Sequence, residues 1–148
     1  MMLMAKMVDV GDKEVVKREA TAEGLLVLKK STVQAIAAGT VKKGDVVTAS
    51  KLAGIQAAKS TSSLLPLCHQ IPLTSVQVEV VAAGDKLRCT CTVRAEYRTG
   101  VEMEALVGVS VALLNAWDMV KYLEKDESGQ YPEARMTDVR VISKRKGG

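Results

Sequence analysis

The chain has 148 residues, a length that suits one domain with a substantial core. Hydrophobic residues make up 47% of it, which excludes a disordered chain, and aromatic residues only 3%, so the core must be built mainly from Val, Leu, Ala, Ile and Met. The formal net charge of +4 suits an anionic partner without requiring nucleic acid.

No apolar run approaches the length of a membrane span, and the first ten residues lack the apolar region and cleavage site of a signal peptide. We therefore expect a cytoplasmic protein that contacts no membrane. Three cysteines without a visible paired framework predict reduced thiols.

Residues 1–7 are expected to form a flexible tail, and residues 8–148 a single domain, because no repeat or linker divides them. The stretch 15–30 is ambiguous. Its first half is compatible with a helix, whereas residues 25–28 are typical of a strand.

Two helices are predicted next. The first has Ser31 as its N-cap and ends at Gly39. Asp45 is the predicted N-cap of the second, which is rich in Ala and Gly and can therefore pack closely against another backbone.

The clearest pattern lies between residues 73 and 98. Small or apolar residues alternate with polar residues over 74–80 and again over 87–97, and Gly84-Asp85 lies between the two arms. This alternation around a glycine-containing turn predicts an antiparallel hairpin with one buried face.

A long helix is predicted between residues 101 and 126, followed by a loop and a last strand over 135–144. The long helix carries an apolar stripe at helical spacing, which consists of Leu106, Val109, Leu113, Ala116, Val120 and Leu123. The order strand, two helices, hairpin, long helix, strand predicts an α+β fold, a ferredoxin-like antiparallel sheet with helices packed on one face.

The only histidine, His69, follows Cys68 in "LPLCHQIP", where Pro66 and Pro72 exclude a regular helix. Four interpretations stay open: a cysteine nucleophile activated by the imidazole, a pair of metal ligands, an ordinary loop histidine, and a stiff loop that grips a ligand. Because a lone histidine is unspecific, spacing alone favours the ordinary loop histidine.

Two pairs of charged residues have both a structural and a functional interpretation. Glu102 and Glu104 open the long helix, where carboxylates favour the helix dipole but could also accept the paired N–H donors of a guanine-like base. Asp118 and Lys121 are three residues apart, which fits either a surface ion pair or a general acid–base pair.

The sequence resembles the MoaC family, the cyclic pyranopterin monophosphate synthases of molybdenum cofactor biosynthesis, in four stretches: "MVDVGDKEVVKREATAEG", "KKGDVVTASKLAGIQAAKSTSSLLPLCHQIPL", "TGVEMEALVGVSVALLNAWDMVKYLEKD" and "VRVISKRKGG". The resemblance runs from about Met7 to the end. Taken together, the runs "AGIQAAK", "PLCH" and "GVEMEAL" are hard to obtain by chance.

The resemblance implies a lyase that converts 3′,8-cyclo-7,8-dihydroguanosine 5′-triphosphate into cyclic pyranopterin monophosphate and releases pyrophosphate. It implies a homohexamer, a trimer of dimers, with ferredoxin-like subunits and sites at subunit interfaces. No cofactor and no protein metal site are expected, although Mg²⁺ could accompany the triphosphate. The partners are then the small substrate and other copies of the chain, with no nucleic acid.

By motif, the resemblance assigns catalytic roles to Asp118 and Lys121 in "WDMVK" and to Lys43 in "KKGDV". It assigns substrate contacts to Leu67, Cys68, His69, Glu102, Met103, Glu104, Arg18 and Lys144. Arg18 and Lys144 are the cations expected near the phosphates. The sequence departs from bacterial members in a longer loop, "ESGQYPEARMTD", and in its ending, "SKRKGG", so the choice of Lys144 over Lys146 depends most on the alignment.

Asp118 by itself would raise the pKa of Lys121, so we expect nearby cations such as Lys43 to reverse that shift and make Lys121 the group that moves the proton. We also expect an oligomer with shared sites, in which Lys43 and Asp118 are a pair that different chains could supply.

Two other classes of protein remain. A small basic nucleotide- or RNA-binding module without turnover fits the charge, but three Tyr and one Trp are scattered and give no stacking platform. A purely structural oligomer subunit leaves the polar face around Asp118 unexplained.

Overall fold

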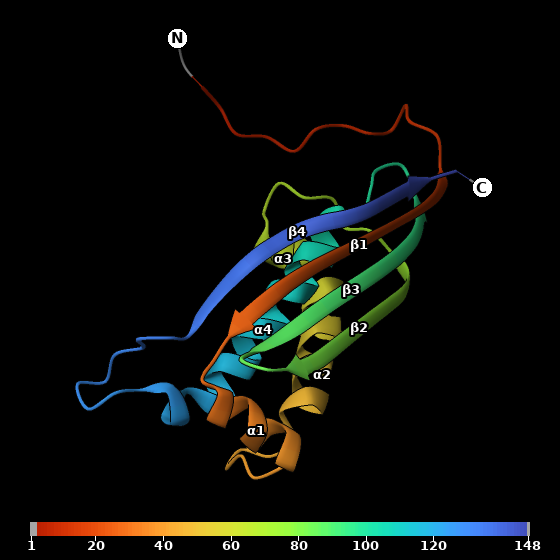
Figure 1. Cartoon of the computed structure of the whole chain (residues 1–148). Helices are drawn as coiled ribbons and strands as arrows, with labels where there is room; N and C mark the ends of the chain where they lie inside the picture. The colour runs from red at the N-terminus through yellow and green to blue at the C-terminus, as the bar shows by residue number, and fades with distance from the viewer. Residues whose placement is uncertain (1–2, 148) are drawn as a thin grey trace.

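In the computed structural model, which describes residues 3–147, one antiparallel sheet carries the helices on one of its faces (Figure 1). The elements in chain order are β1 (Val16–Val27), α1 (Lys30–Ala38), α2 (Val46–Lys59), α3 (Thr61–Leu64), β2 (Leu73–Ala83), β3 (Lys86–Tyr97), α4 (Glu102–Glu124) and β4 (Arg135–Lys146). The strand order is β2-β3-β1-β4. The predicted α+β, ferredoxin-like fold is confirmed, with the short helix α3 as an addition. The predicted tail includes Met1 and Met2, which lie outside the described residues.

Strand β1 shows that the helix-compatible interpretation of its first half is wrong. Arg18, Ala20 and Ala22 are buried on the side of the helices, and Glu19 and Glu23 alternate with them on the open face. The charged and small residues of this short stretch fit the spacing of a helix as well as that of a strand. The segment forms a strand because β3 and β4 pair with β1 along its two edges.

Two carboxylates on the open face of the sheet are each held by two arginines, one from β3 and one from β4. The two sets are Glu19 with Arg94 and Arg145, and Glu23 with Arg88 and Arg140. The arginine hydrogen bonds hold the pKa of both carboxyl groups below the ordinary value. Each set therefore links three adjacent strands across β1.

The start of α1 differs from the prediction, because Ser31 is not its N-cap. The buried carboxylate of Glu124, on α4, accepts hydrogen bonds from the backbone N–H of Lys29 at 3.0 Å and from the hydroxyl of Thr32. A residue distant in the sequence thus takes the role expected of a local cap. The end of α1 is as predicted, with Gly39 at a φ of 71°.

Helix α2 and the β2–β3 hairpin form as predicted. Oδ1 of Asp45 accepts a hydrogen bond from the backbone N–H of Thr48 at 3.1 Å and so caps α2. The turn of the hairpin contains Gly84 at a φ of 63°, a conformation that favours glycine.

Helix α4 approaches both the sheet and α2 closely at glycine positions. A Cβ atom at Gly24 of β1 would lie 2.8 Å from Val109, and one at Gly54 of α2 would lie 2.9 Å from the carbonyl oxygen of Gly108. Real side chains do not tolerate such distances without displacement. The position of α4 therefore depends on the absence of side chains at these contacts.

Helix α4 also corrects the expectation about apolar runs, since by length and composition its 23 residues could cross a membrane. Half of its most apolar window is buried inside the protein. Val109, Leu113, Ala116 and Val120, four members of the predicted stripe, are fully buried in the core. In this fold α4 packs as the central core helix.

The change Gly54→Ala tests the close approach of α2 and α4. Alanine in a helix is favoured over glycine by about 1 kcal/mol, so a free helix position would gain stability. Here we expect a loss of about 1–3 kcal/mol in the free energy of unfolding, because the new methyl group meets backbone. Denaturant unfolding measures it, with the exposed Gln56→Ala in α2 as control; a stabilised Gly54→Ala protein would contradict the packing.

Candidate active site

Three charged side chains, which we call the ion-pair cluster, meet near the C-terminal end of α4: Lys43, Asp118 and Lys121. Lys43 lies in the connection between α1 and α2, and its Nζ is 2.9 Å from Oδ2 of Asp118. Nζ of Lys121 is 2.9 Å from Oδ1 of the same carboxylate. All three side chains are about half exposed and therefore accessible to a ligand. The structure brings together all three residues to which the resemblance assigns catalytic roles.

The electrostatics of this cluster correct one expectation. Hydrogen bonds from Lys43 and Lys121 lower the pKa of Asp118 to about 2. The pKa of Lys121 is raised, not lowered, because Asp118 hydrogen-bonds it and attracts its charge. Lys43 does not reverse this shift, because the Asp118 carboxylate also neutralises the positive charge of Lys43. Without ligand, Lys121 therefore holds its proton at neutral pH.

The second correction concerns the origin of the cluster. We expected Lys43 and Asp118 as a pair that different chains could supply. A single chain already joins them at 2.9 Å, because the connection that follows α1 packs beside the end of α4. A shared site must therefore draw on other residues.

A second group, the helix-start cluster, lies at the other end of α4: Cys68, Glu102, Glu104 and Lys144. Sγ of Cys68 is 4.0 Å from Oε2 of Glu104, and Nζ of Lys144 is 3.3 Å from Oε1 of Glu102. The Glu104 residue is only 3% exposed, and its Oε1 is buried without a hydrogen-bond partner among the described residues. A buried acceptor without a partner favours a ligand that donates hydrogen bonds.

Burial raises the pKa of two members of this cluster, Glu104 and Cys68. It raises the pKa of Glu104, with a contribution from the charge of Glu102. It also raises the pKa of the Cys68 thiol, to which the negative charge of Glu104 adds. A thiol that stays protonated is a poor nucleophile, which argues against covalent chemistry at Cys68.

His69 directly follows Cys68 of the helix-start cluster, but its imidazole binds the N-terminal segment. Nε2 of His69 is 2.6 Å from the carbonyl oxygen of Val8, a hydrogen bond in which the imidazole donates. The side chains of Leu67 and Met103, also candidates for substrate contact, are exposed. These apolar surfaces are therefore available to a flat ligand.

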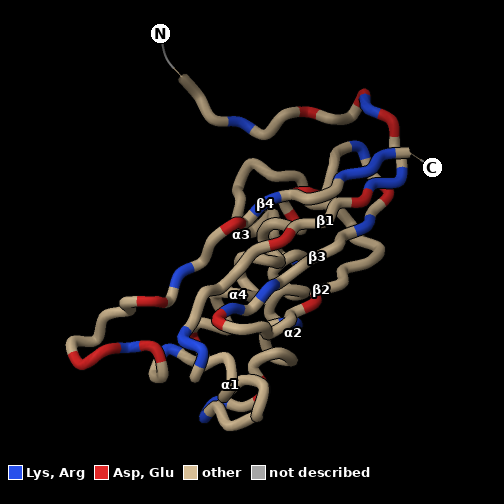
Figure 2. Tube along the Cα trace, in the orientation of Figure 1, with Lys and Arg blue, Asp and Glu red and all other residues tan. Residues whose placement is uncertain are grey.

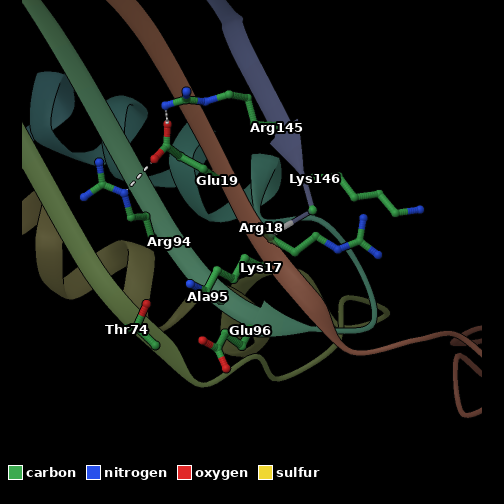
Figure 3. Close-up of a pocket in the computed structure, with 10 residues that line it drawn as sticks. Lys17, Arg18, Glu19, Thr74, Arg94, Ala95, Glu96, Arg145 and Lys146 are labelled. Carbon is green, nitrogen blue, oxygen red and sulfur yellow. Dashed lines mark hydrogen bonds and ion pairs between the residues drawn. The ribbon is translucent and has the colours of Figure 1, made fainter.

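Arg18 lines a pocket whose lining does not include Lys144. It is 7% exposed, its Nε has no partner among the described residues, and it pairs in register with Lys146 at the ends of β1 and β4. Both line a pocket of about 470 Å³, in which Arg18 and Lys146 extend to one side and the Glu19 set to the other (Figure 3). Figure 2 shows the basic residues along these two strand ends. Lys146 is thus beside Arg18, whereas Lys144 is paired with Glu102.

The two clusters are far apart within one chain. Glu104 and Asp118 are both on α4, and at a rise of about 1.5 Å per residue their Cα atoms are about 20 Å apart along the helix. One small ring system cannot contact both, because hydrogen bonds need heavy atoms about 3 Å apart. One chain therefore keeps the two groups of predicted site residues apart.

Sequence reasoning did not single out Tyr122, which lies on α4 four residues after Asp118. The hydroxyl of Tyr122 accepts a hydrogen bond from the backbone N–H of Lys42 at 2.9 Å. The spacing of four residues from Asp118 was the available signal.

Sequence reasoning also missed Tyr131, whose ring packs edge-on against Trp117 at 5.3 Å between centroids. Neither contact follows from local sequence, because each partner comes from a distant loop.

Among residues 3–147, no three His, Cys, Asp or Glu side chains gather in a way that could hold a metal ion. The fold, the exposed ion-pair cluster and the cation-lined pocket are those of a small α+β protein with charged side chains open to an anionic ligand. The chain belongs to the MoaC family, whose family model matches residues 7–147.

The chain is similar to three archaeal proteins, each named "Probable cyclic pyranopterin monophosphate synthase". It is 57% identical to the Thermococcus kodakarensis protein over 142 residues, which cover 96% of this chain and 91% of the relative. Identity to the Sulfolobus acidocaldarius protein is 54%, covering 95% and 98% of the two chains. For the Saccharolobus solfataricus protein it is 52%, covering 96% and 95%.

The change Glu104→Gln tests the electrostatics of the helix-start cluster. Because burial raises the folded-state pKa of Glu104, the ionised carboxylate lowers stability as the pH rises above the unfolded pKa of about 4.3. We expect the free energy of unfolding of Glu104→Gln to increase relative to that of wild type as the pH rises through that window, because only wild type loses stability there. Denaturant titrations at several pH values measure this, with the exposed Glu79→Gln as control. A difference that does not vary with pH would contradict the shift.

Proposed function

We propose that this chain is a cyclic pyranopterin monophosphate synthase, an enzyme of molybdenum cofactor biosynthesis. In this proposal it converts 3′,8-cyclo-7,8-dihydroguanosine 5′-triphosphate into cyclic pyranopterin monophosphate and pyrophosphate. The observation that carries the proposal is the Asp118 carboxylate held between two ammonium groups, each 2.9 Å away, on an exposed surface. Membership of the MoaC family and the names of the relatives support it.

Formation of a cyclic monophosphate from a triphosphate requires an oxygen of the substrate to attack the α-phosphorus while pyrophosphate leaves. That step needs cations around the departing oxygens more than it needs a nucleophile from the protein. Arg18 and Lys146 line the pocket that suits this role, and Lys144 lies on the same strand. Arg18 is buried and its Nε has no hydrogen-bond partner among the described residues, which favours an anion that approaches it.

Opening and closing the rings of the base also requires protons to move between nitrogen, carbon and oxygen. Asp118, with a pKa of about 2, stays ionised at neutral pH and orients the two ammonium groups. Lys121 starts protonated and so acts first as an acid toward the bound ligand. Substrate that displaces Asp118 from Lys121 would lower the lysine pKa and let it take a proton back.

The helix-start cluster suits recognition of the base. A carboxylate accepts hydrogen bonds from the ring N–H and amino group of a guanine-like base, and Glu104 has a free buried oxygen for this role. Glu102 and Met103 lie in the same first turn of α4, and His69 with its neighbours Leu67 and Cys68 forms the facing loop. We propose that these residues hold the base while the ion-pair cluster performs the chemistry.

These roles require two chains at each site. Recognition of the base and protonation of the same ring system must occur within a few ångströms, but the two clusters are about 20 Å apart along α4. We propose that the helix-start cluster of one subunit faces the ion-pair cluster of another, in a homohexamer built as a trimer of dimers. The cytoplasmic location, the absence of a resident cofactor and possible Mg²⁺ on the triphosphate stay predictions.

The assay that tests the function is incubation of the purified chain with the cyclised triphosphate. We expect stoichiometric release of pyrophosphate and of cyclic pyranopterin monophosphate. Binding of the nucleotide without release of pyrophosphate would support the alternative, a nucleotide-binding module without turnover, and would overturn the proposal.

The changes Asp118→Asn and Lys121→Ala test the ion-pair cluster. We expect each to lower kcat by roughly a hundredfold or more, the usual scale for loss of a general acid or base. The double variant should lose much less than the product of the two, because the residues act as a unit. Asp85→Asn, another exposed aspartate paired with a lysine, is the control. Near-normal kcat in a folded Asp118→Asn protein would reduce the cluster to a surface ion pair.

Subunit mixing tests the shared site. Glu104→Gln and Asp118→Asn proteins, each inactive, should regain part of the wild-type turnover when mixed, unfolded and reassembled, because some sites then receive both intact clusters. A mixture of Asp118→Asn and Lys121→Ala proteins is the matched control and should stay inactive, since one chain supplies both residues. Full activity of an isolated monomer by light scattering and assay would contradict a shared site.

A further inference from the structure

The connection between α1 and α2, residues 40–45, carries Lys43 and is held against the end of α4 by adjacent residues. The backbone N–H of Lys42 donates a hydrogen bond to the Tyr122 hydroxyl at 2.9 Å. The ammonium group of Lys42 also lies 5.0 Å from the centroid of the same ring, a cation–π distance. The next residue, Lys43, reaches Asp118 at 2.9 Å.

From this contact we propose that Tyr122 is a positioning residue that holds Lys43 against Asp118. The inference rests on the proposed function, in which Lys43 and Asp118 belong to the catalytic cluster. Tyr122 does not touch the reacting groups in this account. It acts on the backbone one residue before Lys43.

The helix geometry explains why one side chain can do this. Tyr122 is four residues after Asp118, so the two side chains lie one above the other on the same face of α4. The helix therefore grips the connection at two adjacent points, through a carboxylate at residue 43 and a phenol at residue 42. Two points fix the direction of the chain, which one ion pair cannot do.

The need for such a hold follows from the nature of Lys43. Its side chain is half exposed and ends a flexible four-carbon stem, which loses rotamer freedom when it is held in one geometry. Its backbone lies outside any helix or strand, between Gly39 at the end of α1 and Asp45 at the cap of α2. A hydrogen bond to the preceding N–H limits the backbone motion that would otherwise carry the ammonium group away from Asp118.

The test compares Tyr122→Phe, which removes only the hydroxyl, with wild type. Lys43 makes the largest contribution to the lowered pKa of Asp118, so a looser Lys43 should raise that pKa toward its ordinary value. The Asp118 carboxyl signal in ¹³C NMR spectra, followed from about pH 6 down to about pH 3, should then titrate further in the variant. Tyr97→Phe, the same chemical change on β3, should leave the Asp118 signal as in wild type.

Turnover provides the second readout. We expect Tyr122→Phe to lower kcat by about tenfold while KM changes by less than about twofold, because the change misplaces a reacting group without removing a binding contact. Lys42→Ala keeps the backbone N–H and removes only the ammonium group over the ring, so its kcat should fall less than that of Tyr122→Phe.

The outcomes separate this inference from the proposed function. A raised Asp118 pKa together with a lower kcat supports the positioning role. An unchanged Asp118 pKa, or a raised pKa with wild-type kcat, overturns it. If wild type itself releases no pyrophosphate, the proposed function fails, and the NMR comparison alone still shows whether Tyr122 holds Lys43 against Asp118.

Discussion

The packing of helix α4 on the sheet is the constraint on which the candidate site depends. The helix has 23 residues and carries Glu102 and Glu104 in its first turn and Asp118 and Lys121 near its last. Close contacts at Gly24 and at Gly54 fix its position. Because an α-helix is rigid over this length, the two clusters cannot approach each other within one chain. The separation of the two clusters is therefore a property of the fold.

The parts of the fold that the sequence predicted correctly are those that local patterns determine. The hairpin follows from strict alternation around Gly84, and α4 from a stripe of apolar residues at helical spacing. Asp45 and Gly39 act at helix ends as local chemistry predicts. The elements that were predicted wrongly are those that depend on residues distant in the sequence. Strand β1 owes its state to pairing with β3 and β4 along its two edges, and the start of α1 owes its cap to Glu124, far along the chain.

The same distinction applies to the candidate site. The spacing of Asp118 and Lys121 indicated a pair, but only the resemblance to a family brought in Lys43, which the fold then places at 2.9 Å. The expected sign of the Lys121 pKa shift was wrong because the nearby cation, Lys43, is itself paired with Asp118. It therefore does not lower the pKa of Lys121. The Tyr122 contact could not be predicted, since it depends on where a loop of six residues, 40–45, meets a helix in space.

The pairing of β4 with β1 has a consequence for the order in which the molecule forms. Arg18 and Lys146 are neighbours in the sheet although nearly the whole sequence separates them, and contacts of such high sequence separation are slow to form. Synthesis also proceeds from the N-terminus, so the hairpin and α4 exist before residues 135–146 emerge. The pocket beside Arg18 is therefore complete only when the final strand docks. In the proposed function, a polyphosphate bound there would stabilise the complete four-stranded sheet over forms without β4, because β4 supplies Arg145 and Lys146 to the pocket.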